Sequence, residues 1–151
     1  MRAAFRLGLL AVGALLLLAG PAAANSCTLS ATAVAFGNYN IFTTTNVLAN
    51  GSVTFKCTQS KAITIQLTKG SSSSFNPRTM KLSTDVLNYN LYINAALTTI
   101  WGDGTGGSSI YSNAAPGTGT VIVTVYGSVP ALQQSMAAGS FTDTVTATIT
   151  F

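Results

Sequence analysis

The sequence has 151 residues, a length typical of one domain. It contains seven Lys or Arg, three Asp, no Glu and no His, and its net charge at pH 7 is +4. This charge is too small and too scattered for a nucleic-acid-binding protein. The lack of His and Glu removes side chains that metal sites and acid–base catalysis most often use.

The N-terminal stretch is typical of a cleaved signal peptide. Two arginines precede an apolar run over residues 7–18, and three alanines follow it. We therefore predict a signal peptide at residues 1–24 and an exported domain at residues 25–151. The apolar run is shorter than a membrane span of about 20 residues, and an uncleaved anchor is the alternative. Without the leader, five cations and three anions leave a net charge of +2.

The two cysteines, Cys27 and Cys57, both lie in the exported part. Because export leads to an oxidising compartment, we predict a disulfide between them. Free buried thiols or a metal pair are the alternatives, but a metal site lacks further ligands in a chain without His or Glu.

Apolar and polar side chains alternate with a period of two along most of the exported part, which is the pattern of β-strands. The last segment is the most regular, with five threonines on one face and mainly apolar residues on the other. The predicted strands are residues 28–36, 52–58, 61–68, 79–83 (a short edge strand), 86–94, 119–129 and 141–151.

The connections between these strands are short and mostly polar. Residues 58–61 predict a hairpin between the second and third strands, and residues 131–134 hold the only plausible helical turn. Since no helix of ordinary length separates the strands, a parallel βαβ fold is excluded. The pattern predicts an all-β fold: one immunoglobulin-like antiparallel β-sandwich.

No constellation of side chains predicts an enzyme or a cofactor site. There is no His for a nucleophile–base pair. A G-x-G-x-x-G match at residues 102–107 is not followed by the helix that a dinucleotide site needs. Asp143 interrupts the apolar face of the last strand, and we expect it at the rim of that strand.

Trp101 and Tyr111 flank the glycine-rich loop and are candidate surface-binding residues. They are exposed anchors for a surface or ligand in one interpretation and core residues in the other. Burial is favoured for Trp101, since large aromatic side chains are mostly buried.

Several short motifs, taken together and in this order, resemble the spore coat U domain. They are Cys27 just after the leader, AFGNY at 35–39, VTFKC ending at Cys57, LNYNLY at 87–92, WGDG at 101–104, VYG at 125–127, and the closing segment from FTDTV at 141–145 to Phe151. That family includes the Csu-type subunits of archaic chaperone–usher pili and secreted proteins named for a bacterial spore coat.

The resemblance implies an immunoglobulin-like sandwich that lacks one strand. The gap exposes an apolar groove, which a periplasmic chaperone fills until a neighbouring subunit replaces it at the outer-membrane usher. The C-terminal strand borders this groove in the family. The residues implied to line the groove or contact the chaperone are Val145, Ala147, Ile149 and Phe151.

The resemblance also implies passage through the periplasm to the cell surface, as part of a fimbrium or as a secreted protein. After cleavage only Asn25 and Ser26 would precede Cys27, so the chain is expected to accept a donor strand and hardly to give one. That would suit the pilus tip. A self-contained secreted coat or matrix protein is the second hypothesis, and a surface-binding module or enzyme using Trp101 and Tyr111 is the third.

Overall fold

The computed structural model describes residues 24–134 and 137–151, so the predicted signal peptide, except for Ala24, lies outside it. The described chain contains eight strands and no helix, and so no helix that could cross a membrane. This confirms the all-β prediction. The strands are β1 (Cys27–Thr32), β2 (Val47–Cys57), β3 (Ile63–Leu67), β4 (Arg78–Leu82), β5 (Asp85–Tyr92), β6 (Tyr111–Asn113), β7 (Thr120–Val129) and β8 (Ala147–Thr150).

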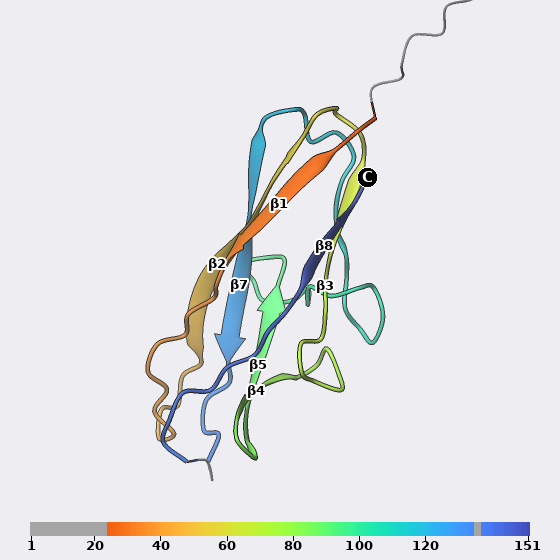
Figure 1. Cartoon of the computed structure of the whole chain (residues 1–151). Coiled ribbons are helices and arrows are strands. Elements are labelled where there is room, and N and C mark those ends of the chain that lie inside the picture. Colours follow the sequence, from red (N-terminus) through yellow and green to blue (C-terminus); the bar gives the residue numbers. More distant parts are fainter. Residues whose placement is uncertain (1–23, 135–136) are drawn as a thin grey trace, which may run out of the picture.

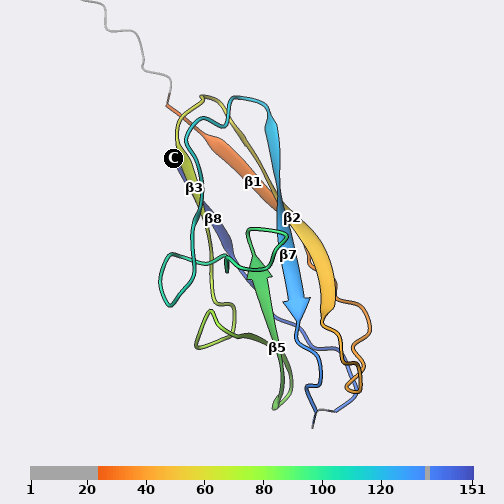
Figure 2. The ribbon, with the colours of Figure 1, turned by 180° about the vertical axis from the view of Figure 1, so that it is seen from behind.

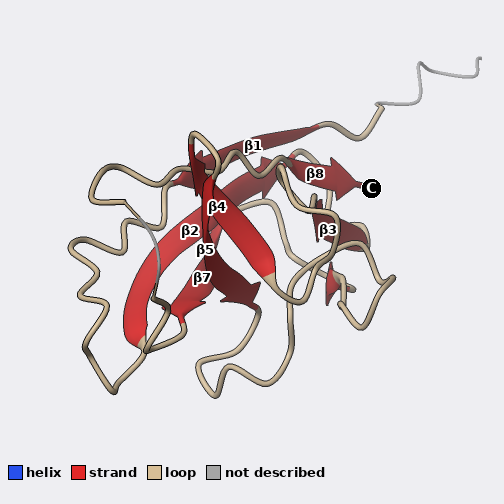
Figure 3. Cartoon of the chain, turned by 90° about the horizontal axis from the view of Figure 1, so that it is seen from below, coloured by secondary structure: helices blue, strands red, loops and turns tan. Residues whose placement is uncertain are grey.

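The strands form two antiparallel sheets. The large sheet has the order β1-β2-β7-β5-β4, and the small sheet has the order β6-β3-β8. Viewed along the molecule, β3 and β8 lie to one side of the large sheet (Figure 3). The predicted edge strand is confirmed, because β4 ends the large sheet.

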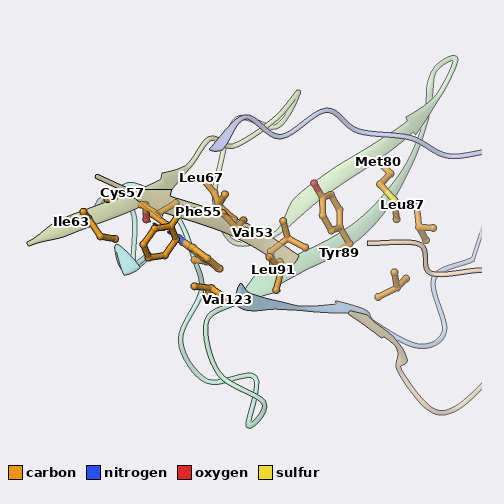
Figure 4. Close-up of a cluster of buried hydrophobic side chains, with 14 residues drawn as sticks. Val53, Phe55, Cys57, Ile63, Leu67, Met80, Leu87, Tyr89, Leu91 and Val123 are labelled. Atoms are coloured by element: carbon orange, nitrogen blue, oxygen red, sulfur yellow. Dashed lines mark hydrogen bonds between the residues drawn. The ribbon is translucent and has the colours of Figure 1, made fainter. Parts of the chain in front are cut away.

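The core lies between the sheets and is built by alternate residues of their strands (Figure 4). In β2, for example, Val53, Phe55 and Cys57 are buried while Lys56 is exposed. The period-two pattern of the sequence therefore identifies the inward faces correctly. The buried hydrophobic cluster consists of Val53, Phe55, Cys57, Ile63, Ile65, Leu67, Met80, Leu87, Tyr89, Leu91, Trp101, Val123, Val125 and Val129.

The predicted disulfide is present. Cys27 at the start of β1 pairs with Cys57 at the end of β2, with an S–S distance of 2.07 Å and a Cα–Cα distance of 4.1 Å. The bond joins two neighbouring strands of the large sheet at one end of their ladder, where Cys27 and Cys57 are register partners.

The predicted hairpin at residues 58–61 is wrong. β2 and β3 belong to different sheets, and β3 pairs with β6 and β8 instead. Residues 58–61 carry the chain from one sheet to the other. An alternating pattern identifies the buried face of a strand but not its partner, so two consecutive strands facing one core can lie in opposite sheets.

β2 begins five residues earlier than predicted, at Val47. The Asn50-Gly51 pair, a common turn sequence, lies within the strand. A Cβ atom at Gly51 would lie 2.7 Å from the Thr32 carbonyl oxygen and 2.8 Å from the Val34 side chain. Glycine is required there because the segment at residues 32–34 approaches closely, and no turn is formed.

The predicted helical turn at residues 131–134 is also wrong. Leu132 has a φ of 57°, which a right-handed helix does not allow. The Gln133 side chain accepts a hydrogen bond from the Asn88 amide and donates one to the Asn88 carbonyl. These contacts with β5 replace the local hydrogen bonds of a turn.

Candidate functional site

Two strand edges face each other without being paired. Within the described chain, β1 pairs only with β2, and β8 pairs only with β3. β1 and β8 lie side by side near the C-terminal end of the chain and spread apart toward the opposite end (Figures 1 and 2). Each strand therefore presents one row of backbone N–H and C=O groups that no neighbouring strand uses.

A groove of about 450 Å³ lies where β1 and the C-terminal segment spread apart. We call it the β1–β8 groove. Its floor is formed by the core residues Val53, Leu67, Met80, Tyr89, Leu91 and Val125, and Figure 4 labels all of these except Val125. Its walls are formed on one side by Ala31, Thr32, Ala33, Val34, Phe36 and Ser52, and on the other by Phe141, Thr142, Asp143, Thr144, Val145 and Ala147.

The C-terminal wall crosses from one sheet to the other. Thr142 and Lys81 of β4 exchange two backbone hydrogen bonds, with N–O distances of 2.9 and 3.1 Å. Four residues later, the Thr146 carbonyl accepts a hydrogen bond from the Thr68 amide at 3.0 Å. The predicted strand at residues 141–151 is therefore interrupted, and only Ala147–Thr150 form β8.

Asp143 lies in the crossing segment and is the only carboxylate that lines the groove. Its Oδ2 accepts a hydrogen bond from the Tyr89 hydroxyl at 2.6 Å, and its Oδ1 accepts one from the Ser71 amide at 2.8 Å. Oδ1 also accepts one from the Thr144 amide at 2.9 Å. Burial, followed by the hydrogen bond to Asp143, raises the pKa of Tyr89 above its ordinary value. Asp143 lies before β8 and not at the rim of that strand, where the sequence predicts it.

Arg78, the first residue of β4, is fully buried (0% exposed). Its guanidinium donates to the Thr68 carbonyl through Nε and Nη2, to the Trp101 carbonyl at 2.6 Å, and to Asn90 Oδ1 at 2.9 Å. Its Cζ lies 5.0 Å from the centroid of the Phe75 ring. Burial lowers the pKa of Arg78, and its bonds tie the edge strand to the small sheet and to the loop at Trp101.

The groove continues into a second hollow of about 700 Å³ beyond the end of β1. Val34, Phe36, Met80 and Phe141 line both. From there the second hollow extends between residues 37–41 and 137–140.

The predicted groove residues fall into two groups. Val145 and Ala147 line the β1–β8 groove. Ile149 does not line it and packs against the core, while Phe151 is 50% exposed at the end of the chain. The opposite wall, at Ala31–Phe36, was missed because its residues alternate only weakly. Tyr89 and Arg78 were missed because their roles depend on partners that are distant in sequence.

Trp101 and Tyr111 are neighbours, with ring centroids 5.6 Å apart. Trp101 is fully buried, and its indole Nε1 donates to the Ile65 carbonyl at 2.9 Å. It is a core residue, the interpretation that the sequence favours, so it presents no ring surface to a ligand. Tyr111 is half-buried in β6.

Several solved chains are similar in fold. One of them belongs to a structure described as the crystal structure of the CsuC-CsuE chaperone-tip adhesion subunit pre-assembly complex from archaic chaperone-usher Csu pili of Acinetobacter baumannii. A chain of that complex superposes with a TM-score of 0.60 and 24% identity over 85% of this chain, which spans 40% of that chain's length. No curated protein is significantly similar to the sequence.

The family assignment agrees with this fold. The family model of the Spore Coat Protein U domain matches residues 13–148, which is most of the sequence. The chain belongs to the Spore Coat Protein U domain family.

Proposed function

We propose that this chain is a structural or adhesive subunit of a chaperone–usher pilus, and that the β1–β8 groove accepts a strand from another protein. The observation that carries the proposal is an apolar floor lying between two unpaired strand edges. A strand laid in this groove would pair with β1 on one side and with the C-terminal segment on the other. Its inward side chains would cover Val53, Leu91 and Val125, which is recognition by strand addition.

The partners follow from this mode of recognition. A periplasmic chaperone would supply the first strand, and a neighbouring pilus subunit would replace it at the outer-membrane usher. The protein would then pass through the periplasm and end on the cell surface. Family membership supports this assignment, and so does the shared fold with a chain from a chaperone–subunit complex.

A strand fused to the chain itself tests the proposal. β8 ends beside the start of β1 (Figure 1), so a strand appended after Phe151 through a short turn can run back along the groove, antiparallel to β8. We expect the oxidised protein without this strand to aggregate, and the fused protein to be a soluble monomer with a higher unfolding midpoint. A soluble, cooperatively folded parent chain that gains nothing from the strand would contradict the proposal and favour a self-contained coat protein.

Two substitutions in β8 provide a matched pair. Ala147→Arg places a charged side chain in the groove, whereas Thr148→Arg places the same side chain on the exposed face. We expect Ala147→Arg to abolish the stabilisation by the fused strand, because an uncompensated charge would be buried beneath it. Thr148→Arg should preserve the stabilisation.

The tip position predicted from the sequence is tested separately. Immunogold labelling of pili from the native strain should mark fibre ends if the subunit lies at the tip. Labelling along the whole fibre would contradict the tip position and leave the pilus function intact.

A further inference from the structure

Part of the C-terminal wall of the β1–β8 groove is not held by either sheet. Thr142 is held by β4 of the large sheet, and Thr146 is held by Thr68 next to β3 of the small sheet. Between these anchors, residues 143–145 belong to no strand. Yet this stretch lines the groove, through Asp143, Thr144 and Val145. Val145 packs against the core, but no strand ladder of the described residues fixes the backbone of this stretch.

Asp143 makes the contacts that hold this stretch. Its two carboxylate oxygens accept three hydrogen bonds from three parts of the chain: Tyr89 on the groove floor, Ser71 in the loop after β3, and the following residue Thr144. Hydrogen bonds to a carboxylate are among the stronger ones in proteins. The bond to Ser71 spans 72 positions in the sequence and the bond to Tyr89 spans 54, so the contacts are tertiary.

The loop beside Asp143 is shaped to admit the carboxylate. Gly70 has a φ of +66°, and a Cβ atom at this position would collide with the Asp143 carboxylate. The Ser71 amide that follows is thereby brought to 2.8 Å from Oδ1. Tyr89 is buried, so its hydroxyl end of the site is shielded from solvent, whereas the hydrogen bonds from Ser71 and Thr144 are exposed. Gly70, Tyr89 and Asp143 together form what we call the wall latch.

We propose that the wall latch is a positioning device, which fixes residues 143–145 against Tyr89 and the loop at Ser71 so that this wall is in place before a strand arrives. This inference rests on the proposed function, since it concerns how the same groove accepts its partner. Asp143 is a positioning residue and need not touch the incoming strand. A wall fixed in advance lowers the ordering cost of binding.

A positioning role of the latch predicts a result that a merely stabilising role does not. Once a strand fills the groove, the strand itself holds residues 143–145 in place. Removing the latch should therefore slow the entry of a strand into the groove much more than it lowers the stability of the strand-filled form. Asp143→Ala removes all three hydrogen bonds, Tyr89→Phe removes one, and Gly70→Ala crowds the carboxylate.

The test compares the open and filled forms of each variant. The probe is a synthetic ten-residue peptide of alternating isoleucine and threonine, fluorescently labelled and mixed with oxidised protein freshly diluted from urea. We expect Asp143→Ala to slow peptide association by about tenfold to a hundredfold, and Tyr89→Phe or Gly70→Ala to slow it by a smaller factor. The strand-fused forms should lose less free energy of unfolding than the slower association corresponds to. Asp103→Ala is the matched control, because its carboxylate accepts two hydrogen bonds from Thr105 in an exposed loop.

The outcomes separate the two proposals. If the peptide does not bind the parent protein, and the fused strand gives no stabilisation, the proposed function fails. If the peptide binds the parent protein and all three latch variants at equal rates, the strand-accepting groove stands and the latch is refuted. The latch would also be refuted if the slower peptide association of Asp143→Ala were matched by an equal loss in the free energy of unfolding of its fused form. That result would indicate a purely structural role.

Discussion

Replacing Arg78 tests whether the buried guanidinium holds the two sheets together. In Arg78→Met the side chain keeps much of its length, but the Thr68 and Trp101 carbonyls lose the donors described above. Asn90 Oδ1 keeps a second donor, the Leu91 amide at 3.0 Å. The buried Trp101 carbonyl left unsatisfied costs about 1–3 kcal/mol, and the part-buried Thr68 carbonyl adds a smaller cost because water can reach it. Replacement by methionine offsets part of this loss, because the cost of burying a charge is removed. We therefore expect a net loss of about 1–3 kcal/mol in the free energy of unfolding.

Urea unfolding of the oxidised, strand-fused protein at pH 7 measures this loss, with the slope checked for constancy. Arg78→Lys should be at least as damaging, because the charge stays buried while the planar fork that reaches several acceptors is lost. Lys81→Met lies in the same strand at an exposed position and serves as the control, for which a change within about 0.5 kcal/mol is expected. A loss below about 1 kcal/mol in Arg78→Met would refute the assigned role.

Three further predictions concern the disulfide, the buried indole and the buried phenol. Replacing both cysteines by serine should lower the free energy of unfolding by about 3–4 kcal/mol, the loop-closure value for a separation of 30 residues, as measured by urea unfolding with and without reductant. Trp101→Phe leaves the Ile65 carbonyl without its 2.9 Å donor and should cost about 1–3 kcal/mol by thermal or urea unfolding; an unchanged midpoint would contradict the role of this hydrogen bond. Because the pKa of Tyr89 is raised above its unfolded value of about 10, the native state keeps a proton that the unfolded chain loses. Stability should therefore fall as the pH rises above about 10, and Tyr89→Phe should reduce that fall in a series of urea midpoints.

The parts of the fold that depend on local pattern were predictable. The alternation around Phe55 and Ile65 identifies buried faces, because the side chains of a strand point to opposite sides in turn. The disulfide followed from the compartment and from the presence of only two cysteines. Val145 and Ala147 were placed in the groove through the resemblance to a known family.

The parts that depend on distant partners were not predictable. The sequence identifies Arg78 only as a cation, yet it is buried because carbonyls from two separate segments and one amide oxygen satisfy it. Asp143 stands out as a polar residue on an apolar face, but its contact with Ser71 requires the fold to be known. Gly51 shows the same limit: the Asn50-Gly51 pair has the sequence of a turn, but the glycine is needed because residues 32–34 of the same chain approach it closely.

The position of the disulfide links the groove to the redox state of the chain. β1 is an edge strand whose ladder with β2 is the only one it forms within the described residues, and the Cys27–Cys57 bond fastens that ladder at one end. A reduced chain keeps the same apolar floor but loses the covalent tie of one wall. In the route that we propose, this bond would form in the periplasm, so one wall of the groove would be fastened in the same compartment in which a donor strand is available.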